Sequence, residues 1–111
     1  MKIDFPNPKH KATLEDSRQV TKLYGPQTAR KLGSRFDDLD ATHSMGDMRS
    51  LPGHWEELNG GRSGQFSARL HGSYRLIVKP QKHPPPVKAD GGLDWSAIDS
   101  IYIVDVVDHH D

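Results

Sequence analysis

The sequence predicts an α+β fold, with a mostly antiparallel sheet and an N-terminal helical hairpin packed on one of its faces. Three observations predict it: a short alternating strand at the N-terminus, two amphipathic helical segments after it, and three strands in the second half of the chain. The economical packing for the order β-α-α-β-β-β is one sheet with both helices on the same face. With 111 residues, the chain is expected to form a single domain over residues 1–111.

The N-terminal half supplies the first strand and the helical hairpin. Met1–Phe5 alternates apolar and polar residues, which is typical of a strand. Helix formers dominate from about residue 11 to residue 24, after which Gly25 suits a helix C-terminus and Pro26 suits the first turn of the next helix. Gly33 lies inside this second helix and weakens it by roughly 1 kcal/mol relative to alanine. The apolar stripe of the second helix consists of Ala29, Leu32, Phe36 and Leu39.

The C-terminal half combines loops with a strongly apolar last strand. Residues 42–61 show no long period and predict a loop with at most one helical turn. The prolines and glycines of residues 80–92 exclude a strand there, and residues 94–98 predict a turn of helix. Residues 100–107, SIYIVDVV, are rich in β-branched side chains and apolar on both faces, which predicts a central position in the sheet.

Between these segments lies a predicted β-hairpin that carries two arginines. Residues 64–70 and 74–79 alternate apolar and polar side chains on either side of a turn that contains Gly72. Arg69 and Arg75 fall near the middle of these strands. Because the helices cover only one face of the sheet, we expect one or both arginines to project onto the open face.

Composition excludes several classes of protein and site. The chain has no cysteine, which excludes disulfides and thiolate zinc sites. No segment has the length and hydrophobicity of a signal peptide or a membrane span, so a cytoplasmic location without membrane contact is the default expectation. The formal net charge is +0, so the general basic excess of a nucleic-acid-binding protein is missing, and only a local basic patch would serve.

The last strand ends in VVDHHD, which leaves three interpretations open: a solvated chain end, a metal site, or a place where protons are transferred. Adjacent residues of a strand point to opposite faces, so His109 and His110 are poorly placed to bind one ion, and no metal is expected. On the same argument, Asp108 and His110 share one face and His109 takes the other.

Three pieces of the sequence, in their order and spacing, resemble the HigB branch of the RelE/ParE toxin superfamily. The first piece is LPG at residues 51–53, which leads into EL at 57–58 and GGRSGQ at 60–65; the second is YRLI at 74–77. The third is the terminal DHH at 108–110, and the insert around DGG at 90–92 is similar to one subgroup of that branch. The resemblance extends from Ala29 to His110.

The resemblance implies a RelE-like fold and the toxin role of a type II toxin–antitoxin pair. Such toxins cleave messenger RNA on the ribosome and are silenced by a cognate helix-turn-helix antitoxin, here a HigA-like one. The implied chemistry uses no metal and no cofactor: the 2′-hydroxyl attacks the adjacent phosphate, an acid–base pair moves the protons, and cations hold the developing charge.

The resemblance also implies the site residues. Arg75 matches the strand arginine of the family and is expected to stabilise the phosphate, and Asp108, His109 and His110 match its terminal acid–aromatic–His group. We expect His110 to lie on the Arg75 face as acid or base, with Asp108 orienting it. Further contacts to RNA are expected from Arg62, Arg69 and His54.

Three departures from the family pattern support an alternative function. Asn59 stands where the family has a basic residue, Glu56 or its neighbour where it often has a histidine, and His109 where it has a tyrosine. With the neutral net charge, these departures are compatible with a catalytically weakened module that pairs with an antitoxin and tunes operator binding, or with a gyrase-inhibiting relative. A gene directly downstream that encodes a small helix-turn-helix protein would support a toxin–antitoxin pair in either case. Activity measurements would then distinguish an active toxin from a weakened one.

Overall fold

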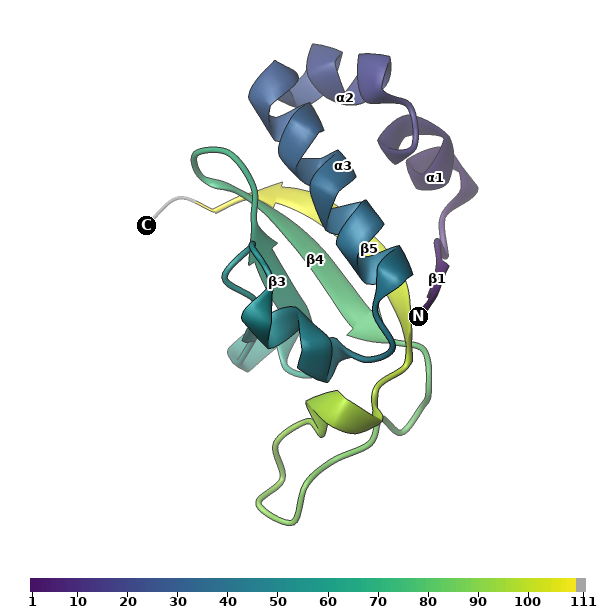
Figure 1. Ribbon diagram of the computed structural model, residues 1–111, viewed down its shortest axis with the longest axis vertical. Coiled ribbons are helices and arrows are strands. Elements are labelled where there is room, and N and C mark those ends of the chain that lie inside the picture. Colours follow the sequence, from purple (N-terminus) through teal and green to yellow (C-terminus); the bar gives the residue numbers. More distant parts are fainter. Residues whose placement is uncertain (110–111) are drawn as a thin grey trace.

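The computed structural model describes residues 1–109 and has the predicted α+β architecture. Its sheet has five strands in the order β1-β5-β4-β3-β2 (Figure 1). β1 runs parallel to β5, and the other neighbouring strands are antiparallel. The strands comprise β1 (Lys2–Asp4), β2 (Glu56–Glu57), β3 (Phe66–Arg69), β4 (Tyr74–Pro80) and β5 (Ser100–Asp108). The predicted central position of the last strand is confirmed, because β5 lies between β1 and β4.

The helices form a layer on one face of the sheet, but the expectation of one helix before Gly25 is wrong. Two helices occupy that segment, α1 (Pro8–Leu14) and α2 (Ser17–Tyr24). Asp16 causes the break, because its side chain accepts a hydrogen bond from the Arg18 backbone N–H at 3.0 Å and so caps α2. α1 also starts earlier than expected, since the Asn7 side chain accepts bonds from the N–H groups of Lys9 and His10.

The predicted second helix is α3 (Pro26–Ala41), which crosses the sheet (Figure 1). Leu32 and Leu39 are fully buried against the sheet, as expected from the stripe, whereas Ala29 and Phe36 are only partly buried. Arg35 is buried as well, and its Nε donates to the Arg69 carbonyl at 3.1 Å. Burial lowers the pKa of the Arg35 guanidinium, the nearby Asp38 carboxylate opposing that effect.

A strand that the sequence did not predict lies in the segment expected to be a loop. Residues 42–61 contain the 3₁₀ helix η1 (Met45–Ser50) and then β2, whose Glu56 and Glu57 pair with Ser67 and Phe66 of β3. β2 is only two residues long, which is too short for an alternation pattern to be visible in the sequence. The remaining short elements are η2 (Gly60–Arg62) and η3 (Trp95–Ala97), the latter at the predicted helical turn.

The core lies between the sheet and the helices. On β4, Leu76 and Val78 belong to this core cluster, together with Phe66 and Ala68 of β3 and Ile101, Ile103 and Val106 of β5. Ile77 is buried too, but it points to the opposite face of the sheet. No helix within residues 1–109 is both long and apolar enough to cross a membrane.

One irregularity in β5 decides which side chains face the open side of the sheet. Val78 pairs with Ile103, whereas Ile77 pairs with Asp105, so Val104 is an extra residue opposite β4. A β-bulge of this kind shifts the alternation of side chains by one position. Before the bulge the odd-numbered residues Ile101 and Ile103 are buried in the core, and after it the even-numbered Val106 takes that role.

Candidate active site on the open face of the sheet

A pocket of about 330 Å³ lies on the sheet face opposite the helices. Strands β3, β4 and β5 form its floor, and the segment after β2 forms its wall. Its lining combines two arginines, a carboxylate and an imidazole with small and apolar side chains: Glu56, Leu58, Asn59, Gly61, Arg62, Ser67, Arg75, Ile77, Val107 and His109.

Arg75 comes from the second residue of β4 and lies in this pocket, as predicted for an arginine on the open face. Its Nη1 donates to the backbone carbonyls of Gly72 at 3.1 Å and Tyr74 at 2.9 Å. Among residues 1–109, no carboxylate forms an ion pair with Arg75, so the alternative of a structural salt bridge to Asp105 or Asp108 is not seen. The main chain thus orients the guanidinium, and the Nε–Nη2 edge is available for an anion.

Arg62 enters the same pocket from η2, in the wall segment. Its Nη1 donates to the Gln65 side chain at 3.1 Å, which fixes the guanidinium beside the open face. Asn59 also lines the pocket, at the position where the resemblance would place a basic residue. The two arginines make this pocket a local basic site in a chain whose formal net charge is +0.

His109, and not Asp108, shares the Arg75 face, so the expected orientation of the C-terminal residues is wrong. Val107 pairs with Arg75 and lines the pocket with His109, whereas Asp108 pairs with Tyr74. The bulge at Val104 is the physical reason, because it reverses the alternation over the rest of the strand. His110, the other residue expected on this face, lies outside the described residues.

The end of β5 is attached to the turn of the β3–β4 hairpin. The His109 backbone N–H donates to the Ser73 carbonyl at 2.8 Å. The Ser73 hydroxyl also donates to the Asp108 carboxylate. Asp108 therefore helps to hold the strand end to the hairpin, and this attachment positions the His109 side chain at the pocket.

Glu56 is a pocket residue that the sequence did not identify as a site residue. The two residues of β2 point in opposite directions, and they have different partners. Glu57 accepts from the Trp95 indole N–H at 3.1 Å and from the Leu93 backbone N–H at 3.3 Å, whereas Glu56 lines the pocket with Arg75. The only sequence signal for a role of Glu56 was that it, or its neighbour, occupies a position where the toxin family that the sequence resembles often has a histidine.

Two expected RNA contacts lie away from this pocket. Arg69 pairs with Arg75 across β3 and β4, but it is exposed at the end of its strand and does not line the pocket. His54, whose φ is 49°, lines a neighbouring pocket with Arg49, Trp55 and Trp95. Glu56 borders both pockets, so they adjoin each other.

The pocket brings together groups that suit acid–base chemistry at a phosphate. A carboxylate and an imidazole can act as a base and an acid, and guanidinium groups can bind phosphate oxygens in a bidentate manner. Within residues 1–109, no cluster of three or more histidine, aspartate or glutamate side chains is arranged to hold a metal ion.

Comparisons with known proteins identify solved structures that share the fold of this chain. No protein-family model matches the chain, and no match is found among curated proteins. Solved structures do match: a chain of the YoeB–YefM complex from Staphylococcus aureus has a TM-score of 0.57 and 16% identity, with 99% of this chain and 98% of that chain covered. The YoeB/ParE toxin from Agrobacterium tumefaciens has a TM-score of 0.57 and 13% identity, covering 99% and 100% of the two chains. The described part of the chain therefore shares the fold of these two structures.

Proposed function

We propose that this protein is the toxin of a toxin–antitoxin pair and cleaves messenger RNA on the ribosome. The observation that carries the proposal is the pocket in which Glu56, Arg75 and His109 meet, with Arg62 at its wall. Glu56 lies on β2, Arg75 on β4, His109 directly after β5 and Arg62 on a 3₁₀ helix, so the fold and not the local sequence assembles these groups. The fold shared with a YoeB/ParE toxin agrees with this role.

In the proposed reaction, the 2′-oxygen of one nucleotide bonds to the adjacent phosphorus as the bond from phosphorus to the 5′-oxygen breaks. Glu56 accepts the proton of the 2′-hydroxyl, and His109 donates a proton to the leaving 5′-oxygen. Arg75, with Arg62, binds the phosphate oxygens as their negative charge increases. The products are a 2′,3′-cyclic phosphate and a 5′-hydroxyl, and no further reactant is consumed.

The proposed partners are the ribosome with its message and a cognate antitoxin. One of the structural neighbours is described as a complex of YoeB with YefM, which supports a protein partner for this chain. The three sequence pieces favour the HigB branch and hence a HigA-like helix-turn-helix antitoxin. The two solved structures carry YoeB and ParE names and do not select the HigB branch. Co-expression with the protein encoded by the neighbouring gene, and the type of that protein, would decide between the branches.

Induced expression in a bacterial host tests the proposal. We expect growth to stop, growth to resume when the antitoxin is co-expressed, and primer extension to locate new 5′ ends within translated codons. The Arg75→Ala variant, expressed at the same level, is the matched control and should permit growth. Unimpaired growth and intact message with the wild-type protein would refute the proposal.

A second function has a specific observation in its favour. Asn59 lines the Arg75 pocket where the resemblance would place a cation, which lowers the positive charge available to RNA. A weakened toxin of this kind would still pair with its antitoxin and tune operator binding, and a gyrase-inhibiting relative would stop growth without cutting message. Antitoxin binding without any message cleavage would favour the weakened toxin, and inhibition of DNA gyrase would favour the gyrase-inhibiting relative.

A further inference from the structure

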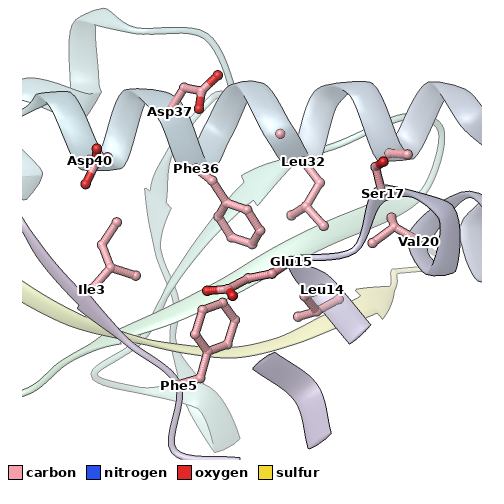
Figure 2. A pocket seen from close by; sticks show the side chains of 12 residues that line it. Ile3, Phe5, Leu14, Glu15, Ser17, Val20, Leu32, Phe36, Asp37 and Asp40 are labelled. Carbon is pink, nitrogen blue, oxygen red and sulfur yellow. The ribbon is translucent and has the colours of Figure 1, made fainter. Parts of the chain in front are cut away.

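A second cavity, of about 420 Å³, forms a groove on the helix side of the molecule, away from the Arg75 pocket. It lies between the α1–α2 corner, α3 and β1, as Figure 2 shows. Its floor is largely apolar, with Phe5 and Phe36 in edge-to-face contact at 6.1 Å between ring centroids. Both rings are only partly buried, so the groove exposes aromatic surface, which marks interaction sites in soluble proteins.

Helix α3 forms one wall of the groove, from Ala29 to Asp40. The lining residues of this helix follow the spacing of three and four that puts side chains on one stripe: Ala29, Leu32, Gly33, Phe36, Asp37 and Asp40. At 1.5 Å per residue the stripe is about 16 Å long, or roughly three helical turns. A groove of this length matches a helical segment better than a small molecule.

Gly33 has no role in the fold of the chain itself that requires a glycine. It lies inside α3, is exposed, and a Cβ atom placed on it would meet nothing within 4 Å. Its φ is not in the left-handed region that favours glycine. Because the distance between packed helices depends on the side chains at their contact, a glycine in the groove wall allows a second helix to approach closely.

The charged side chains that line the groove have a single sign. Among the described residues that line it, Glu15, Asp37 and Asp40 are acidic and none is basic. In Figure 2 the Glu15 carboxylate reaches toward the rings of Phe5 and Phe36. An interface favours a partner of the opposite charge, so the complementary ligand has apolar side chains on one face and basic side chains beside them.

We propose that this groove binds an amphipathic, basic helix of a partner protein. The apolar face of that helix covers Phe5 and Phe36, its backbone passes close to Gly33, and its lysines or arginines face Glu15, Asp37 and Asp40. The inference does not depend on the ribonuclease proposal, since the groove and the Arg75 pocket lie on opposite sides of the sheet.

Fluorescence anisotropy with a defined probe tests this inference. The probe is a labelled peptide of about five helical turns with leucines on one face and lysines on the other, and its counterpart carries glutamate in place of every lysine. We expect the lysine peptide to bind the wild-type protein, and Gly33→Leu and Asp40→Lys each to raise its Kd at least tenfold. Asp90→Lys, the same charge reversal on an exposed loop, should leave the Kd unchanged, as should Arg75→Ala.

Gly33→Ala shows whether the fold needs this glycine. Alanine should raise Tm by about 4 °C, because it favours helix and meets no neighbour. Three results would overturn the inference: the lysine peptide does not bind, the glutamate peptide binds equally well, or both groove variants leave the Kd unchanged. A wild-type dimer that Gly33→Leu dissociates would overturn it as well, assigning the groove to a second copy of the chain.

Discussion

At the scale of single residues, the orientation of Arg75 is the feature that best supports phosphate binding. Many surface arginines are oriented by a carboxylate, but Arg75 is held by two backbone carbonyls of its own hairpin. Its charge is therefore not neutralised by a paired side chain within the described residues. Ile77 and Val107 beside it provide an apolar floor, which strengthens electrostatic interactions with a bound phosphate.

Replacing Arg75 by alanine should abolish cleavage and leave the fold intact. Loss of one cation that stabilises a transition state costs about 3 kcal/mol, or at least a hundredfold in rate. The free energy of unfolding should change by about 1 kcal/mol or less, because only two hydrogen bonds to the main chain are lost, one exposed and one partly buried. Single-turnover cleavage and urea denaturation measure the two effects.

Arg69→Ala is the matched control, since Arg69 is the register partner of Arg75 but lies outside the pocket. We expect it to slow cleavage less than tenfold. Equal losses in the two variants would mean that general positive charge, and not the pocket, is responsible. An unfolded Arg75→Ala protein would instead make this arginine a structural residue.

Two variants distinguish the roles of His109 and His110 in cleavage. His109→Gln should lower the cleavage rate by about 10²- to 10⁴-fold, the range for loss of a general acid, because His109 lines the pocket. Deleting His110 and Asp111 should have a much smaller effect while His109 stays attached to Ser73. The reverse result, activity lost only on truncation, would return the proton-transfer role to His110.

At the scale of elements, the bulge in β5 connects the core to the site. Three buried residues, Ile101, Ile103 and Val106, fix β5 against the helices, and the extra Val104 between them sets the orientation of everything that follows. A regular strand with the same buried start would have turned Val107 and His109 toward the helices. The bulge thus places the imidazole beside Arg75 although the two residues are far apart in sequence.

Deleting one valine from β5 tests this role of the bulge. Removal of Val104 takes out the unpaired residue, so His109 should keep its face and cleavage should stay within about tenfold of the wild-type rate. Removal of Val107 deletes the same type of side chain beyond the bulge. This deletion turns His109 to the Tyr74 face and should lower the cleavage rate at least a hundredfold. Circular dichroism shows whether each variant is folded, and equal activity of the two folded variants would contradict the account.

At the scale of the whole molecule, the sequence predicts the architecture better than the site. Alternation and β-branching identify the hairpin and the last strand, and Gly25–Pro26 correctly separates α2 from α3. The break at Asp16 was visible in principle, since aspartate is a favoured N-cap residue. The expectation that Arg69, Arg75 or both project onto the open face is also confirmed, since Arg75 lines the pocket there.

The rest depends on pairing between distant segments, which a single sequence does not show. β2 exists only because Glu56 and Glu57 pair with β3, and the bulge exists only relative to β4. Both features are needed to bring Glu56 and His109 to Arg75. Neutral net charge, which argued against RNA binding, conceals a separation in space: arginines line the sheet pocket and carboxylates line the helix groove.

The chemical nature of the ends that the purified protein leaves on a ribosome-bound message tests the central claim most directly. Attack by the 2′-hydroxyl predicts a 5′-hydroxyl on the downstream fragment, which polynucleotide kinase can label without prior phosphatase, and a 2′,3′-cyclic phosphate on the upstream fragment. Arg75→Ala, assayed in parallel, should yield at least a hundredfold less of both. Fragments with 5′-phosphates, or cleavage by Arg75→Ala at the wild-type rate, would contradict the account.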